Sequence, residues 1–314
     1  MTDDRTDTDR ASPITKRQII DDLRAIGVCD GDHLGLGISF RRIGAVEGGP
    51  EGFVDAMVET VGPKGTIMLP SFMQLNPNVI LDYKTTPAYT GLIPEIVRKR
   101  SDSLRSTHPT HAVVALGHMA EHLTRAHDPS ARMYLPYSTL TELGGKILCI
   151  GIGDNLVGFR HEVQDQAGLL DKVTYRRTFR YRNENGEVKK TYRRCKIPCV
   201  ARLPELVNLL RNANLVGEGR VGAASSVLVP TRESMEILTA TLKNDPTLNL
   251  CDSITCLWCR RLEWIMRLYG SIENPKFFQS NPLARHCLAA INWLRLKEIP
   301  LLIRLRHLRL WDRF

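Results

Sequence analysis

Residues 105–169 carry histidines and glycines in positions where they could do chemistry. The stretch contains His108 and His161 and joins two apolar, strand-like runs, Ala112–Leu116 and Lys146–Ile150, each followed by a glycine. Histidine gives and takes protons most readily near neutral pH. A glycine just past a strand lets the backbone approach a ligand, and strand ends are where open α/β sheets place their sites. We therefore expect this stretch to build the functional site.

Strand-like and helical patterns alternate from about residue 15 to residue 170, which indicates an α/β layered domain. Apolar residues recur at helical spacing after the expected helix cap Thr15, and Gly48-Gly49-Pro50 is expected to open a second helix. Thr66–Leu69 has the composition of a buried strand. Further expected elements are a basic β-hairpin over Val173–Tyr181 and Lys189–Val200, a helix over Glu205–Arg211, a strand over Arg220–Val229 and a helix over Arg232–Leu242.

The composition is that of an ordinary globular protein with a basic balance. The chain has 314 residues, of which 43% are hydrophobic and 25% charged, enough to bury a large core. The formal net charge of +9 favours an anionic partner over a polycationic one. No apolar run reaches the roughly 18–20 residues that span a bilayer, and the N-terminus is polar, so a cytoplasmic protein is expected. The scattered cysteines also favour a reducing compartment.

The patterns divide the chain into three parts. Residues 1–14 are expected to be a disordered tail, and residues 15–245 to form the α/β domain. Residues 246–314 are expected to form a helical, cysteine-containing and basic C-terminal extension.

Four groups of motifs follow one another over residues 15–230. They are Leu23–Val28 with Gly31-Asp32 and Ser39–Gly44; Val61–Thr66 running into Leu69-Pro70; Thr90-Gly91-Leu92 leading to Arg105-Ser106-Thr107-His108-Pro109; and Ser138–Leu140 with Leu143–Leu148, Gly151 and His161. In this order they resemble the aminoglycoside 3-N-acetyltransferase (antibiotic N-acetyltransferase) family.

The resemblance implies a three-layer α/β/α fold and the transfer of an acetyl group from acetyl-coenzyme A to a small amine acceptor. The base of the family is a histidine in a helix-opening His-x-x-Glu motif, and His161 falls on that histidine. Five positions match the cofactor-side motif and loops of the family, and are expected to bind the cofactor: Arg105, Ser106, His108, Ser39 and Ser138.

Several polar positions of the family pattern are replaced in this chain. The His-Ser-Ser of the first loop is Gly37-Ile38-Ser39, and the serine after His-Pro-x-x is Ala112. The threonine three residues before the base is Gly158, and the glutamate three residues after it is Gln164. These losses leave open a catalytically silent member that acts as a binding or scaffold protein.

The loss of the glutamate raises the question of what supports His161. An amide can orient an imidazole but cannot stabilise its protonated form as a carboxylate does. Asp165 lies four residues beyond His161 and would share its helix face. We therefore expect a His161–Asp165 pair with Gln164 at the rim, while the adjacent Glu162 points elsewhere.

The basic hairpin bears on the choice of acceptor. Aminoglycosides carry several positive charges, and a basic cluster repels each close charge by about 1 kcal/mol even in water. The hairpin therefore favours an amino sugar on an anionic carrier, such as a nucleotide or lipid diphosphate, in polysaccharide or natural-product metabolism. A solvated basic face is the alternative. The cluster comprises Arg176, Arg177, Arg180, Arg182, Lys189, Lys190, Arg193 and Arg194.

A nucleic-acid-binding protein is a less favoured second class. Aromatic residues do alternate with the arginines of the hairpin, as a nucleic-acid-binding face requires: Tyr175, Phe179, Tyr181 and Tyr192. This interpretation leaves the ordered motifs unexplained.

The C-terminal extension contains two further patterns. Cys251, Cys256 and Cys259, with Cys287 further on, have a spacing typical of iron–sulfur ligation. Their apolar neighbours favour an amphipathic helix instead, and acetyl transfer needs no redox centre, so no metal is expected. The basic and apolar residues 293–314 could lie peripherally on an inner membrane surface, or dock on the core or on another subunit of a homo-oligomer.

Overall fold

The computed structural model describes residues 12–73, 79–169, 174–196, 203–246, 248 and 250, which all lie in one compact unit, residues 1–260. The helices are α1 (Lys16–Ile26), the short 3-10 helix η1 (Phe40–Arg42), α2 (Gly49–Val61), α3 (Leu92–Lys99), α4 (Ala120–Thr124), α5 (Leu135–Glu142), α6 (Phe159–Gln166), α7 (Leu203–Asn212) and α8 (Thr231–Asn244). The strands are β1 (His33–Ile38), β2 (Thr66–Pro70), β3 (Ile80–Asp82), β4 (Ser103–Arg105), β5 (Val113–Gly117), β6 (Lys146–Ile150), β7 (Thr174–Arg182), β8 (Val188–Lys196), β9 (Gly217–Val221) and β10 (Ala224–Pro230).

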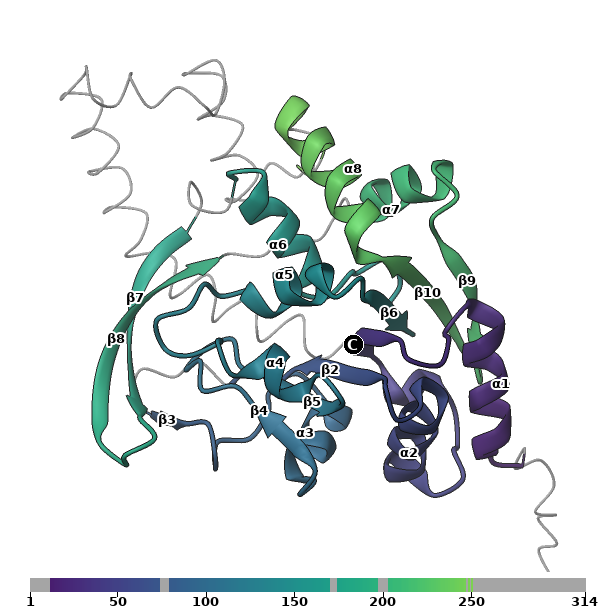
Figure 1. Ribbon diagram of the computed structural model, residues 1–314, viewed down its shortest axis with the longest axis horizontal. Coiled ribbons are helices and arrows are strands. Elements are labelled where there is room, and N and C mark those ends of the chain that lie inside the picture. The colour runs from purple at the N-terminus through teal and green to yellow at the C-terminus, as the bar shows by residue number, and fades with distance from the viewer. Residues whose placement is uncertain are drawn as a thin grey trace, which may run out of the picture. The chain divides into compact units, whose positions relative to one another are not determined.

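A seven-stranded sheet in the order β4-β5-β2-β1-β6-β10-β9 forms the centre of this unit (Figure 1). β1 runs parallel to both of its neighbours, β2 and β6. β5 and β10 run antiparallel to β2 and β6, respectively. The sheet therefore has a parallel centre, whose three strands end at one edge, and antiparallel flanks.

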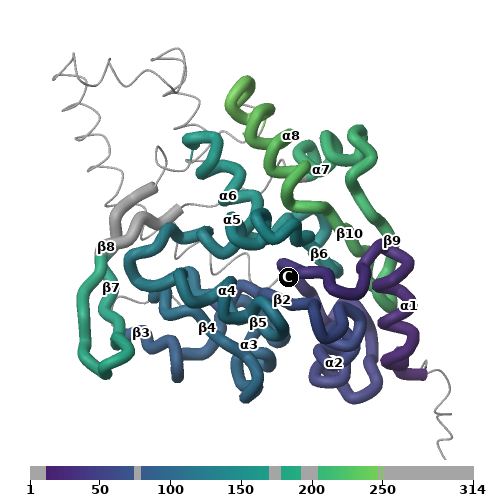
Figure 2. The backbone as a smooth tube through the Cα atoms, viewed as in Figure 1, coloured from purple at the N-terminus to yellow at the C-terminus, as the bar shows by residue number. Residues whose placement is uncertain are grey.

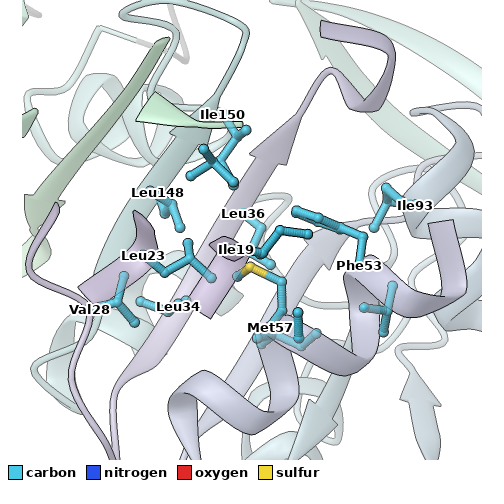
Figure 3. Packing of buried hydrophobic residues seen from close by; sticks show 14 of the residues in the cluster. Ile19, Leu23, Val28, Leu34, Leu36, Phe53, Met57, Ile93, Leu148 and Ile150 are labelled. Atoms are coloured by element: carbon cyan, nitrogen blue, oxygen red, sulfur yellow. The ribbon is translucent and has the colours of Figure 1, made fainter. Parts of the chain in front are cut away.

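One face of the sheet carries the main hydrophobic core. Leu34 and Leu36 of β1 are fully buried against α1 and α2, because alternate side chains of a strand point to the same face. Figure 3 shows Leu23 of α1 and Phe53 and Met57 of α2 gathered over these strands. Each such side chain stabilises the fold by about 1.5–3 kcal/mol. The helical spacing that predicted α1 and α2 is thus the spacing of their core contacts.

The other face is covered by α4, α5 and α8, and α6 packs on α5 and α8. Gly35 of β1 makes room for this layer, since a Cβ there would lie 2.9 Å from Leu140 Cδ2 of α5. Segments distant in sequence also meet between layers, as the helix α1 and the strand β9 do (Figure 2). Helices on both faces of the sheet confirm the expected three-layer α/β/α fold.

The basic hairpin forms a separate sheet. β7 and β8 pair antiparallel, and β3 joins β7 in parallel. Phe179 is buried with Leu81 and Ala112, whereas Arg180 and Lys190 are exposed. The predicted hairpin is therefore confirmed, and its buried side is apolar.

The expected helices at Thr15, at Gly48-Gly49-Pro50 and over Arg232–Leu242 are confirmed, and Thr15 caps α1 through a capping box with Gln18. The single strand expected over 220–229 is wrong, because the chain reverses at Gly222. This glycine has a φ of +56°, which separates β9 from the antiparallel β10.

The ends of the expected domains fall mostly outside the described residues. Residues 1–11, Cys251, Cys256, Cys259, Cys287 and the segment 293–314 are outside them. Ile14, expected in the disordered tail, instead pairs with Val46, and its N–H donates to Ala45 O at 2.8 Å. None of the helices in the described part of the chain has the length and apolar character needed to cross a membrane.

Candidate active site

The candidate site lies where the parallel strands β2, β1 and β6 end. Their last residues are followed by Ser71, Ser39 and Gly151. Gly151 adopts a φ of +67°, and a Cβ there would lie 3.0 Å from Arg42 Cβ and 3.3 Å from Ser39 O. The missing side chain thus allows Arg42 and Ser39 to lie close to this glycine, and the close approach of a ligand stays a prediction.

The matching expectation for Gly117, the last residue of β5, is wrong. Gly117 is paired with Thr66, at the start of β2, because β5 runs antiparallel to β2. It therefore lies at the opposite edge of the sheet. The segment that precedes β5 reaches the site edge instead, as the hydrogen bond from Ser71 N–H to Ala112 O (2.8 Å) shows.

His161 lies in the first turn of α6 and is 8% exposed. Its Nε2 accepts a hydrogen bond from Arg160 Nε at 3.3 Å, and its Nδ1 lies 3.0 Å from Gln164 Oε1. A guanidinium can only donate, so Nε2 is the unprotonated nitrogen of the neutral ring and Nδ1–H donates to Gln164. This tautomer leaves the Nε2 lone pair as the proton acceptor.

The predicted His161–Asp165 pair is wrong. Asp165 Oδ2 accepts from Arg132 Nη1 at 2.6 Å, and Gln164 takes the place against the imidazole that was expected of Asp165. The two helix positions share a face, as expected, but an arginine from the loop before α5 attracts the carboxylate more strongly than a neutral ring can.

Glu162 does point away from His161, as expected. Its side chain is fully buried and its carboxylate accepts from Ser138 Oγ, from Gln166 Nε2 at 2.8 Å and from both Nη atoms of Arg132. Ser138, expected to contact the cofactor, is thus bound to Glu162. The group forms an ion cluster that ties α6 to α5 and to the loop before it.

Arg105 holds loops together at the same strand edge. Its Nη1 donates to Tyr83 O (3.0 Å) and Thr86 O, and its Nη2 donates to Ser71 O (2.6 Å). Burial lowers the pKa of Arg105 to about 10, so the guanidinium stays charged at neutral pH. The guanidinium of Arg105 was expected to contact the cofactor, but it instead donates hydrogen bonds to three backbone carbonyl oxygens.

Ser106 and His108 are also buried and bound within the protein. Ser106 Oγ accepts from Val113 N–H and lies 3.0 Å from Nδ1 of His127. His108 Nδ1 accepts from His111 N–H at 3.0 Å, and its ring stacks on that of His127 at a centroid distance of 4.5 Å. The cofactor contacts predicted for these residues stay predictions. Ser39 differs from them, since its half-buried hydroxyl makes no hydrogen bond to another described residue.

Aromatic ring contacts connect the segment around His108 and His111 to His161. The ring of Tyr134 lies 5.1 Å from that of His161 and 5.3 Å from that of His111, which in turn lies 4.9 Å from Phe72. Sequence reasoning missed Tyr134, Arg160 and Arg132. Only Arg160 carried a signal, because it adjoins His161; the other two approach from a different loop.

Gly37 and Gly158 stand where the family pattern has polar residues, and neighbouring side chains fill the space beside each glycine. A Cβ on Gly37 would lie 2.4 Å from Val157 Cγ2, and a Cβ on Gly158 would lie 2.3 Å from a ring carbon of Tyr137. Val157 and the buried Leu156 before it have φ values of +45° and +47°, which are costly for side chains of this kind. The loop that leads into α6 is therefore strained and tightly packed.

Neither a thiol nucleophile nor a metal group is found at this edge. Burial raises the pKa of the Cys149 thiol to about 12, so a thiolate is not available at neutral pH. Within the described ranges, no three His, Cys, Asp or Glu side chains are grouped so that they could hold a metal ion. A neutral imidazole with a fixed tautomer, at the carboxyl edge of an α/β/α protein, defines a candidate enzyme that works by general-base catalysis.

Comparison with known proteins gives the family. The model of the family described as "Aminoglycoside 3-N-acetyltransferase" matches residues 37–243. The chain belongs to this family of acetyltransferases.

Curated relatives agree with this assignment. Aminoglycoside N(3)-acetyltransferase VII of Streptomyces paromomycinus is 27% identical over 261 residues, which cover 71% of this chain and 90% of the relative. Aminoglycoside N(3)-acetyltransferase III of Salmonella sp is 32% identical over 197 residues, which cover 55% of this chain and 68% of the relative.

Solved structures share the fold. The apoenzyme of aminoglycoside acetyltransferase AAC(3)-IVa matches with a TM-score of 0.71 and 25% identity, over 81% of this chain and 98% of that one. A mutant of the same enzyme in complex with gentamicin matches with a TM-score of 0.66 and 26% identity, over 77% and 93% of the two chains.

Proposed function

We propose that this protein transfers an acetyl group from acetyl-coenzyme A to an amine of an amino sugar or aminoglycoside-like acceptor, with His161 as the general base. The observation that carries the proposal is the imidazole of His161, whose Nδ1–H is fixed by Gln164 and whose Nε2 is directed to accept a proton. Membership of an acetyltransferase family supports the donor.

The reaction needs one proton acceptor. A neutral amine attacks the thioester carbonyl carbon, the C–N bond forms, and the amine proton passes to Nε2 of His161. The C–S bond then breaks and the thiolate takes a proton to leave as CoASH. Arg160 Nε occupies Nε2 before the acceptor arrives, so the amine must replace this weak contact of 3.3 Å.

The donor is proposed to lie along the carboxyl edge of β1 and β6. Ser39 offers its hydroxyl there, beside Gly151, whose N–H donates to Ser225 O and whose carbonyl accepts from Arg42 Nη1. Arg105, Ser106, His108 and Ser138 are proposed to shape the donor side through the loops that they hold, rather than through free donors.

The acceptor is proposed to be an amino sugar of polysaccharide or natural-product metabolism, on an anionic carrier. Exposed basic side chains of the β7–β8 hairpin support this choice, although two of them are already paired, Arg182 with Asp82 and Lys189 with Glu187. A cytoplasmic location, a homo-oligomeric state and peripheral membrane contact through residues 293–314 stay predictions.

A silent scaffold on the same fold is the second candidate. The filled spaces at Gly37 and Gly158 favour it, because polar groups of the family are absent from these positions. A nucleic-acid-binding role has the exposed arginines of the hairpin as its support and ranks below both.

Calorimetric titration with acetyl-coenzyme A, followed by mass spectrometry of amino sugars incubated with it, tests the enzyme proposal. Saturable binding and a mass gain of one acetyl group on an amine are expected. A folded protein that binds no acetyl-coenzyme A would instead support the scaffold.

A further inference from the structure

Arg160 places a guanidinium at the proton-accepting atom of the proposed base. The residue lies in the first turn of α6 and is only 8% exposed, and its Nε donates to Nε2 of His161 at 3.3 Å. Burial raises the pKa of the neighbouring Tyr137 and Cys149, and the charge of Arg160 partly opposes this. A buried cation therefore acts directly where the amine is proposed to lose its proton, in a region where little water screens it.

The loop before α6 holds this guanidinium in place. Nη1 of Arg160 donates to the backbone oxygen of Asn155 at 2.9 Å and to its Oδ1. A turn with two positive φ angles separates the two residues and lets their side chains meet. Asp154 anchors the loop to α7, because its carboxylate accepts from Nη1 and Nη2 of Arg211 at 3.1 and 2.9 Å. The guanidinium is thus positioned before any ligand binds, as electrostatic catalysis requires.

Acetyl transfer develops a negative charge next to this position. When the amine nitrogen bonds to the thioester carbon, the π electron pair of the carbonyl group moves to its oxygen and forms an oxyanion. The amine gives its proton to Nε2 of His161, so its nitrogen faces that atom. A single carbon atom separates this nitrogen from the oxyanion. The electron pair then re-forms the carbonyl bond, the C–S bond breaks, and the proton passes from His161 to the thiolate, which leaves as CoASH.

We propose that Arg160 is a catalytic residue whose guanidinium stabilises this oxyanion. Its Nε–H binds the lone pair of His161 until the amine takes that place, and then binds the carbonyl oxygen of the thioester. A guanidinium only donates and is charged, so it binds an oxyanion more strongly than a neutral carbonyl oxygen. The interaction strengthens as the charge develops and therefore lowers the barrier. This inference rests on the proposed acetyl transfer and adds a second group to it.

Two analogues of the donor test this without turnover. S-carboxymethyl-coenzyme A carries a carboxylate in place of the acetyl group, and S-carbamoylmethyl-coenzyme A carries a neutral amide of the same shape. Each is titrated calorimetrically into the full-length wild type and into Arg160→Gln, Arg160→Met and Arg160→Lys. The wild type is expected to bind the carboxylate about tenfold more tightly than the amide. Arg160→Gln and Arg160→Met should lose this preference and keep their affinity for the amide, whereas Arg160→Lys, which keeps the charge, should retain part of it.

Two further variants define the result. Arg24→Gln is the matched control, because Arg24 lies on α1 and donates to the backbone oxygens of Val28 and Thr60; the preference should not change. Asn155→Ala keeps the guanidinium but removes the amide that holds its Nη1, and should lower the preference about threefold.

The same preference in the wild type and in both neutral variants would overturn the inference, as would no preference in the wild type. An equal loss of both analogues in Arg160→Gln and Arg160→Met would also overturn it, since Arg160 would then only maintain the fold. If neither variant folds, Asn155→Ala decides, and an unchanged preference there counts against the inference. A folded wild type that binds neither analogue would contradict acetyl transfer itself, so the two proposals fail in different ways.

Discussion

Two neighbouring sectors of α6 hold their side chains by different means. In the first, His161 lies between the neutral amide of Gln164 and one N–H of Arg160. In the second, Glu162 and Asp165 share the guanidinium of Arg132. The ionic sector fixes where the helix lies, because its bonds join α6 to other segments. The sector around His161 holds no carboxylate and leaves the imidazole able to change its protonation state, which is what a general base needs.

Removing the imidazole of His161 is expected to have the largest effect on activity. His161→Ala is expected to lower kcat/KM by about a thousandfold, within the usual range for a general base. Acetyl-coenzyme A affinity, measured by calorimetry, should stay the same. His122→Ala, on the exposed side of α4, serves as the matched control and should retain the wild-type rate. A mild loss in His161→Ala would show that another group takes the proton.

Adding a carboxylate beside His161 should sharpen the difference between the two sectors. Gln164→Glu places a carboxylate against Nδ1 of His161, which stabilises the imidazolium that forms as the amine loses its proton. We expect kcat to rise by about three- to tenfold. Since the charged ring is favoured, the pH at which activity falls on the acid side should move upward. A pH–rate profile that matches the wild type would mean that the side chain at 164 does not govern the base.

Removing a charge from the ionic sector should cost stability. Glu162→Gln leaves Asp165 as the one carboxylate bound to Arg132 among the described residues, and is expected to lower the free energy of unfolding by about 2 kcal/mol. This is less than the roughly 3–5 kcal/mol for breaking a fully buried pair, because Arg132 is half exposed. Denaturant unfolding measures the loss. Glu121→Gln removes the exposed partner of Arg125 and should change stability by no more than about 0.5 kcal/mol; an equal loss in both variants would contradict the assignment of a structural cluster.

The loop that leads into α6 positions both sectors, and its tight packing can be tested at Gly37. Gly37→Ala brings a Cβ within 2.4 Å of Val157 Cγ2, and such overpacking costs about 1–3 kcal/mol. Val157→Gly removes that side chain and its positive φ penalty, so the double variant should lose less stability than the two single losses predict. Additive losses in thermal unfolding would show that the two positions are independent.

The sequence by itself determined the elements and the family. Helical spacing after Thr15 and apolar runs at Thr66–Leu69 and Lys146–Ile150 sufficed to predict α1, β2 and β6, because local periodicity reports which face is buried. The order of motifs placed His161 on the candidate base. Gln164 was recognised as the departure beside it, although its direct contact with the imidazole was not expected.

The tertiary structure alone decided which side chains meet. The direction of β5 moved Gly117 to the opposite edge from Gly151, and no local pattern reports whether a strand is parallel or antiparallel to its neighbour. Arg132, more than thirty residues earlier in the chain, binds the Asp165 carboxylate that was expected to pair with His161. Long side chains from other loops compete for the same charged groups, and their reach depends on packing rather than on spacing. The sequence therefore pointed to His161 as the candidate base, and the fold selected the partners of that side chain.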